Sequence, residues 1–74
     1  MKRTVLIDPA LVDARMAELS WSASELARRS GVSRPPLYSA LRGENTSRRT
    51  ILKIAAALGV EPSEITRVEV GDPS

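Results

Sequence analysis

Residues 22–42 read SASELARRSGVSRPPLYSALR, and this stretch decides the fold. Ser22 and Glu25 have the spacing of a capping box, in which the serine hydroxyl accepts from the backbone N–H of Glu25 and the carboxylate accepts from that of Ser22. Gly31 predicts where this helix ends, because glycine adopts the left-handed backbone conformation without a Cβ penalty. We therefore expect a first helix over residues 23–30.

A second helix is predicted directly after this turn, over residues 34–42. Val32 is expected to enter the core, Ser33 can cap the helix, and Gly43 closes it. Three apolar residues at helical spacing should form its buried face: Leu37, Ala40 and Leu41. The stretch is thus predicted to form a helix, a tight turn and a second helix.

The pattern S-x-x-E-L-A-x-x-S-G-V-S-x-x-x-L-x-x-x-L-x-G in this stretch resembles the helix-turn-helix of the Cro/phage-repressor (XRE) family. The similarity continues through residues 50–55 and 57–60, so that it covers about residues 12–65. Many helical hairpins share a helix-turn-helix pattern, and the second block at the expected distance makes this resemblance specific. It implies that the second helix enters the major groove of DNA and that the protein regulates transcription.

The rest of the chain is predicted to add two helices and two short strands. Asp8 can cap a helix that has Pro9 at its first position, where a missing N–H costs nothing. The predicted elements are a strand at about 3–7, helices at about 9–19, 23–30, 34–42 and 48–58, a turn at 62–65 and a strand at about 66–70. We therefore predict one mainly α domain over residues 1–74, of the lambda-repressor-like type, with four to five short helices and short N- and C-terminal β-strands.

The predicted core follows from helical spacing. Its members are Val12, Met16 and Leu19 in the first helix, Leu26 and Ala27 in the next, and Ile51, Ile54, Ala55 and Leu58 in the last. We also place Trp21 in the core, because a single tryptophan just ahead of a helix is usually a packing residue.

Composition argues against several classes of function. The 74 residues include no cysteine and no histidine, which removes thiolate chemistry and the commonest general base and metal ligand. The remaining carboxylates, serines and single tyrosine have no spacing that assembles a catalytic site, so we expect no enzyme, no small-molecule substrate, no metal and no cofactor. No apolar run approaches the roughly 20 residues of a membrane span, and the first eight residues are too short for a signal peptide. We expect a cytoplasmic protein with no membrane partner, associated with the nucleoid through DNA.

The charge is unevenly distributed along the chain. Residues 22–53 contain seven basic and two acidic residues, a net charge of +5, whereas the rest contains four basic and seven acidic residues, a net charge of −3. A basic segment that coincides with a helix-turn-helix indicates a polyanionic partner, namely double-stranded DNA. The alternative is a basic surface that is merely solvated.

The predicted DNA contacts lie on and around the second helix of the motif. Arg34, Tyr38 and Arg42 share one face by their i, i+4, i+8 spacing, and arginine can grip the edge of guanine with two hydrogen bonds. The expected base-reading residues are Arg34, Tyr38, Ser39 and Arg42, and the expected contacts to phosphates or at the tip are Ser33, Pro35, Asn45, Thr46, Arg48 and Arg49. Pro35 and Pro36 can offer only apolar contact, because proline has no N–H to donate. The alternative for all of them is an ordinary polar surface.

Arg48 and Arg49 lie where positive charge is unfavourable for a helix. They occupy the first turn of the helix at 48–58, where the helix dipole disfavours cations by up to roughly 1 kcal/mol each. A phosphate at that terminus would meet both the free N–H groups and the guanidinium groups. The unfavourable placement therefore indicates a phosphate contact rather than a structural role.

Three functions remain open. The first is a sequence-specific transcriptional regulator, most simply a small phage- or plasmid-type repressor that acts by occupying its operator. The second, within the same class, is an antitoxin that represses its own toxin–antitoxin operon. The third is a protein-interaction adaptor on the same fold, which the +5 segment disfavours.

The two terminal strands lead to a prediction about assembly. A lone strand has unpaired N–H and C=O groups, so residues 3–7 and 66–70 are expected to pair antiparallel, within one chain or between two. A sheet continued across a two-fold axis would set two recognition helices near the roughly 34 Å spacing of successive major grooves. We therefore expect a homodimer, joined through the terminal strands, on a palindromic operator.

Overall fold

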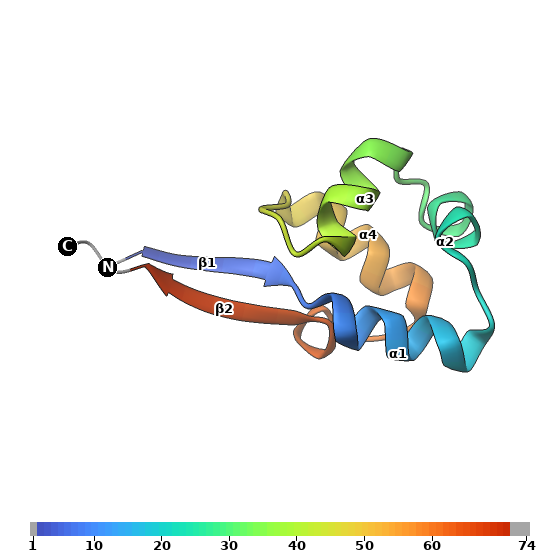
Figure 1. Ribbon diagram of the computed structural model, residues 1–74, viewed down its shortest axis with the longest axis horizontal. Coiled ribbons are helices and arrows are strands. Elements are labelled where there is room, and N and C mark those ends of the chain that lie inside the picture. Colours follow the sequence, from blue (N-terminus) through green and yellow to red (C-terminus); the bar gives the residue numbers. More distant parts are fainter. Residues whose placement is uncertain (1, 72–74) are drawn as a thin grey trace.

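The structure, a computed structural model, describes residues 2–71 of the chain. The elements in chain order are β1 (Lys2–Ile7), α1 (Pro9–Leu19), α2 (Ala23–Ser30), α3 (Arg34–Leu41), α4 (Arg48–Leu58), a short 3₁₀ helix η1 (Pro62–Glu64) and β2 (Thr66–Gly71). The four α-helices form one body, from which the two strands project as a ribbon (Figure 1). The predicted fold class, a mainly α helix-turn-helix fold with short terminal strands, is confirmed.

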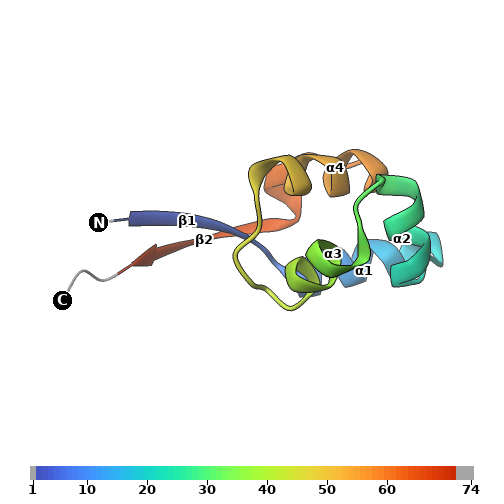
Figure 2. The same cartoon turned by 90° about the horizontal axis from the view of Figure 1, so that it is seen from above.

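The ribbon is antiparallel and forms within one chain. Lys2 lies opposite Gly71 at its far end, and Ile7 lies opposite Thr66 where it joins the helical body. The ribbon runs along the long axis of the molecule, which measures 42 × 22 × 17 Å (Figures 1 and 2). The antiparallel pairing expected of the terminal strands is therefore present, between β1 and β2 of the same chain.

The core lies between the four helices and the inner end of the ribbon. Its buried apolar residues are Leu6, Ile7, Val12, Met16, Leu26, Val32, Leu37, Ala40, Ile51, Ile54, Ala55, Leu58 and Ile65, and no polar side chain is buried among the residues described. One polar contact also joins two helices: Arg15 Nε donates to the carbonyl of Leu58 at 3.0 Å and connects α1 to the C-terminal end of α4.

Within residues 2–71, no helix is long and apolar enough to cross a membrane.

Local capping explains where the helices begin and end. The side chains of Asp8, Ser22 and Ser47 accept from backbone N–H groups in the first turns of α1, α2 and α4 at 3.1, 3.2 and 3.2 Å. Gly31 and Gly59 end α2 and α4 in the left-handed conformation, with φ of 72° and 71°. These contacts lie within a few residues of each boundary, so the sequence could predict them.

Four details differ from the sequence prediction. The Glu25 carboxylate does not complete the capping box, because it binds two arginines instead. Trp21 is only half-buried against the core, with the guanidinium of Arg29 4.6 Å from the centre of its ring. Leu19 and Leu41 are also half-buried rather than buried. The α3 helix ends one residue earlier than predicted, at Leu41, because Arg42 takes the C-cap position.

Candidate nucleic-acid interface

The turn between α2 and α3 fixes how α3 is presented. Gly31 reverses the chain, and Val32 is buried directly after it. The α3 helix then rests on Leu37 and Ala40, both of which are fully buried. Leu37 and Ala40 are three residues apart and therefore share one face of the helix. Because this face packs on the core, the opposite face is exposed to solvent. In Figure 1, α3 lies at the top of the helical body.

The four predicted base-reading residues lie on or at the end of this outward face. Arg34 is exposed at the first position of α3, and Tyr38 is 38% exposed. Ser39 is half-buried, and Arg42 is exposed at the C-cap. The four residues therefore span the accessible length of α3.

Arg42 already has partners. Its Nε donates to Glu44 Oε2 at 2.9 Å, and its Nη2 donates to Ser39 Oγ at 3.4 Å. The hydrogen bond from Arg42 holds the pKa of the Glu44 carboxyl below its ordinary value. Arg34, in contrast, has no acidic group within 4 Å among the residues described. Of the two arginines on the recognition face, only Arg34 is therefore available without exchanging a partner.

The predicted phosphate and tip residues fall into two groups. Ser33, Pro35, Arg48 and Arg49 are exposed, and Ser33 takes the N-cap position of α3 without a side-chain cap hydrogen bond. Arg48 and Arg49 begin α4, and neither forms an ion pair with any residue that the structure describes. Asn45 and Thr46 are more constrained. Asn45 forms an isolated bridge with Leu6 of β1, and the hydroxyl of Thr46 donates to the carbonyl of Glu44 at 2.9 Å.

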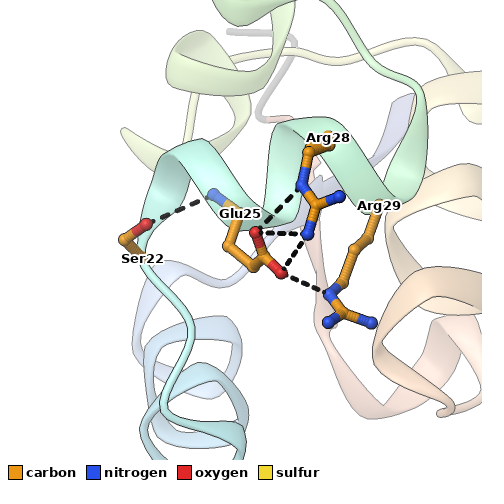
Figure 3. A network of polar contacts seen from close by, with 4 residues as sticks. All are labelled: Ser22, Glu25, Arg28 and Arg29. Carbon is orange, nitrogen blue, oxygen red and sulfur yellow. Dashed lines mark hydrogen bonds and ion pairs between the residues drawn. The ribbon is translucent and has the colours of Figure 1, made fainter.

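The two arginines of α2 share one carboxylate within the chain. Arg28 and Arg29 both donate to the carboxylate of Glu25, each with a shortest distance of 2.7 Å (Figure 3). Hydrogen bonds from Arg28 and then Arg29 lower the pKa of Glu25 to about 2 from its ordinary 4.5. Among the side chains that the structure describes, four basic residues form no ion pair: Arg34, Arg48, Arg49 and Lys53.

The Glu25 network predicts a specific acid dependence. Because the pKa of Glu25 is lower in the folded than in the unfolded chain, its contribution to stability is full above about pH 5 and is lost as the pH falls toward 2. Glu25→Gln should therefore reduce the loss of unfolding free energy between pH 5 and pH 2. Urea denaturation at half-unit pH steps, followed by circular dichroism, measures this loss.

Glu18→Gln is the matched control, since Glu18 lies at 3.6 Å from Arg15, across one turn of α1. This variant should keep the acid dependence of the parent. A Glu25→Gln variant with the parent's full loss of stability between pH 5 and pH 2 would contradict the network.

A hollow beside α3 was missed by the sequence prediction. It lies between α2 and the N-terminal end of α3, has a volume of about 490 Å³, and is lined by Ser22, Ser24, Glu25, Ala27, Arg28 and Arg34. The Glu25 carboxylate accepts from Arg28 at 2.7 Å, so this lining carries charges of both signs. Spacing along the chain could not reveal this hollow, because two separate helices form it. Ser22 ahead of α2 and Arg34 at the start of α3 were its only signal.

Comparisons with known proteins agree with this geometry. The family of Cro/C1-type helix-turn-helix DNA-binding domains matches residues 12–70. Among solved structures, the restriction-modification controller protein C.AhdI from Aeromonas hydrophila is 33% identical, with a TM-score of 0.67 over 76% of this chain and 86% of that chain. The transcriptional regulator VanUg is similar in fold, with a TM-score of 0.72 and 19% identity over 93% of this chain and 89% of that chain. No curated protein matches the sequence.

Proposed function

Because the chain belongs to the family of Cro/C1-type helix-turn-helix DNA-binding domains, we propose that it is a sequence-specific transcriptional regulator that reads double-stranded DNA with α3. Its simplest mode of action is repression by occupancy of the operator. As a homodimer it would bind a palindromic site, since the symmetry of an operator mirrors that of its protein.

One observation carries this proposal: three exposed arginines at the N-terminal ends of α3 and α4 form no ion pair among the residues described. Arg34 stands at the exposed N-terminal end of α3, and Arg48 and Arg49 stand exposed at the N-terminal end of α4. None of the three has an acidic partner among the residues described. Exposed arginines that have no acidic partner within the protein can neutralise the phosphates of a polyanion.

The proposed contacts divide into two kinds. Base reading is assigned to Arg34, Tyr38, Ser39 and Arg42, and backbone or tip contact to Ser33, Pro35, Asn45, Thr46, Arg48 and Arg49. The second kind fixes register and supplies most of the affinity without carrying sequence information.

A more specific role is favoured by one comparison. The C.AhdI controller is 33% identical over 76% of this chain, which supports control of a restriction-modification operon as a particular form of the same DNA-binding activity. The antitoxin and adaptor alternatives have no comparable support. An adaptor would also not account for the three exposed arginines that form no ion pair among the residues described.

Selection from a random duplex library, followed by binding at several salt concentrations, tests the proposal. We expect one enriched palindromic sequence, bound at least about a thousandfold more tightly than random duplex. The logarithm of affinity should fall linearly with the logarithm of salt concentration. An adaptor on this fold would enrich no sequence, and that result would refute the proposed function.

A further inference from the structure

The loop after α3 carries a negative charge beside the proposed DNA-binding face. Glu44 lies two residues beyond the C-cap Arg42, and its side chain is 55% exposed. The position is unfavourable for a carboxylate, because the C-terminal end of a helix is already negative. Phosphates of DNA bound to α3 would repel the same charge. A residue that is unfavourable in both respects is a candidate for a functional role.

The backbone holds Glu44 against the last turn of α3. Gly43 has a φ of 77° and reverses the chain. Its N–H donates to the carbonyl of Ala40 at 3.0 Å, and the N–H of Glu44 donates to the carbonyl of Ser39 at 3.0 Å. These two hydrogen bonds form a Schellman motif, which usually includes an apolar contact between the residues at the positions of Ser39 and Glu44. Both residues are polar here, and both contact Arg42 instead.

The carboxylate of Glu44 binds one edge of the Arg42 guanidinium. Nε of Arg42 donates to Oε2 of Glu44 at 2.9 Å, and Nη2 donates to Oε1 at 3.4 Å. The two hydrogen bonds lie side by side, which fixes the plane of the guanidinium as well as its distance. Both side chains are more than half exposed, and exposed ion pairs add little to stability. The pair therefore positions Arg42 more than it stabilises the fold.

A second edge of the same guanidinium remains for a ligand. The group has five N–H donors in a rigid fork, and Glu44 accepts from Nε and Nη2. Nη1 has no acceptor among the residues described, and Nη2 otherwise meets only Ser39 Oγ, at the long distance of 3.4 Å. Once the contact to Ser39 is exchanged, the Nη1–Nη2 edge can donate two hydrogen bonds together. Guanine O6 and N7 accept an arginine in this way.

The contact with Glu44 distinguishes Arg42 from Arg34. Arg34 forms no ion pair among the residues described, so its side chain loses rotamer freedom when it binds, and this loss opposes binding. Arg42 is already held and loses less. A held guanidinium also reaches fewer phosphates, whose contacts carry no sequence information. The arrangement therefore favours discrimination between bases over affinity for any duplex.

We propose that Glu44 is a positioning residue, which holds Arg42 with its Nη1–Nη2 edge free to read a guanine. The inference rests on the proposed function, since it requires α3 to lie in the major groove. Glu44 acts only through Arg42 and lowers the affinity for all DNA by its own charge. Its contribution is therefore to specificity.

Glu44→Gln tests this role in the full chain, with the duplex enriched from the random library and random duplex as probes. The variant should bind random duplex about twofold more tightly, because one negative charge is removed. Its preference for the selected duplex should fall about tenfold, because Arg42 is no longer held. Glu18→Gln changes the net charge equally at an exposed position on α1 and should keep the parent's preference.

Replacement of single guanines by 7-deazaguanine, which lacks the N7 acceptor, locates the effect. In the parent, the replacement should weaken binding at one guanine read by Arg42 and at another read by Arg34. Arg42→Ala should abolish the first response and Arg34→Ala the second. Glu44→Gln should reduce the first response alone, whereas general damage to α3 would reduce both. The double variant Arg42→Ala/Glu44→Gln should show the same preference for the selected duplex as Arg42→Ala.

Three results would overturn the role of Glu44: a Glu44→Gln variant that binds both duplexes more tightly by one factor, a parent with no guanine response that depends on Arg42, or a further loss of preference in the double variant. The first of these would mean that Glu44 only repels DNA. Failure of the proposed function looks different, since the parent would then enrich no duplex from the library, and the role of Glu44 would fall with it.

Discussion

Leu37→Ala is expected to lower the free energy of unfolding by about 2–5 kcal/mol, the range for truncating a fully buried leucine. Leu37 is fully buried and, with Ala40, holds α3 on the helical body. Small domains have total stabilities at the low end of about 5–15 kcal/mol, so this loss is large enough to unfold much of the chain at 37 °C. Urea denaturation at 25 °C, followed by circular dichroism, measures the change.

Leu52→Ala is the matched control, because Leu52 is the same residue type on α4 but is 46% exposed. It should change the stability far less. Leu26 and Ile54 are as fully buried as Leu37, and their alanine variants should fall in the same range. A Leu37→Ala variant that unfolds at the parent's urea midpoint would contradict the anchoring of α3.

Arg34→Ala should lower the affinity for the selected operator by about 1–3 kcal/mol and relax the sequence preference at one base position. Arg34 stands exposed on the recognition face and forms no ion pair within the part of the chain that the structure describes. Its truncation would therefore remove the proposed contact to DNA without breaking an ion pair within the described part of the protein. Titration of selected and random duplexes, followed by fluorescence anisotropy, measures both effects.

Arg48→Ala and Arg49→Ala are the comparison variants for Arg34→Ala. Each should weaken binding to selected and random duplexes alike and should reduce the slope of log affinity against log salt by about one unit. If Arg34→Ala and Arg49→Ala lower the affinity for both duplexes by equal factors, the division into a base-reading and a phosphate-binding arginine is wrong.

The features that the sequence predicted well depend on contacts over a few residues. Asp8 and Ser22 cap the helices that follow them, and Gly31 ends the helix that precedes it. Such caps are chosen by conformational preference and by hydrogen bonds within one turn. The helix boundaries could therefore be predicted closely without any knowledge of the tertiary structure.

Competition between nearby partners could not be predicted in the same way. The carboxylate of Glu25 can reach either the N–H of Ser22 or the guanidinium groups of Arg28 and Arg29, and it binds the arginines. Charge-assisted hydrogen bonds with two arginines outweigh one neutral hydrogen bond, but spacing alone permits both. The same holds for Arg42, which sequence spacing placed on the DNA face and which the structure pairs with Glu44.

Contacts between segments that are distant in sequence also could not be predicted. The bridge from Leu6 to Asn45 joins residues that no periodicity relates. The hollow lined by Ser22, Ser24, Glu25 and Arg34 exists only because α2 packs beside the N-terminal end of α3. For the candidate site, the sequence could predict which residues belong to the exposed face of α3, and their roles toward DNA remain predictions.

The topology of the ribbon has a consequence for the order of folding. The pairs from Lys2–Gly71 to Ile7–Thr66 join the two ends of the chain, so their closure in an unfolded chain would carry the largest loop entropy in the molecule. The helices form from local contacts, and their packing brings Ile7 and Thr66 together before the ribbon can zip outward. We therefore expect β1 and β2 to form late and to open first, with amide protons that exchange faster than those of α4.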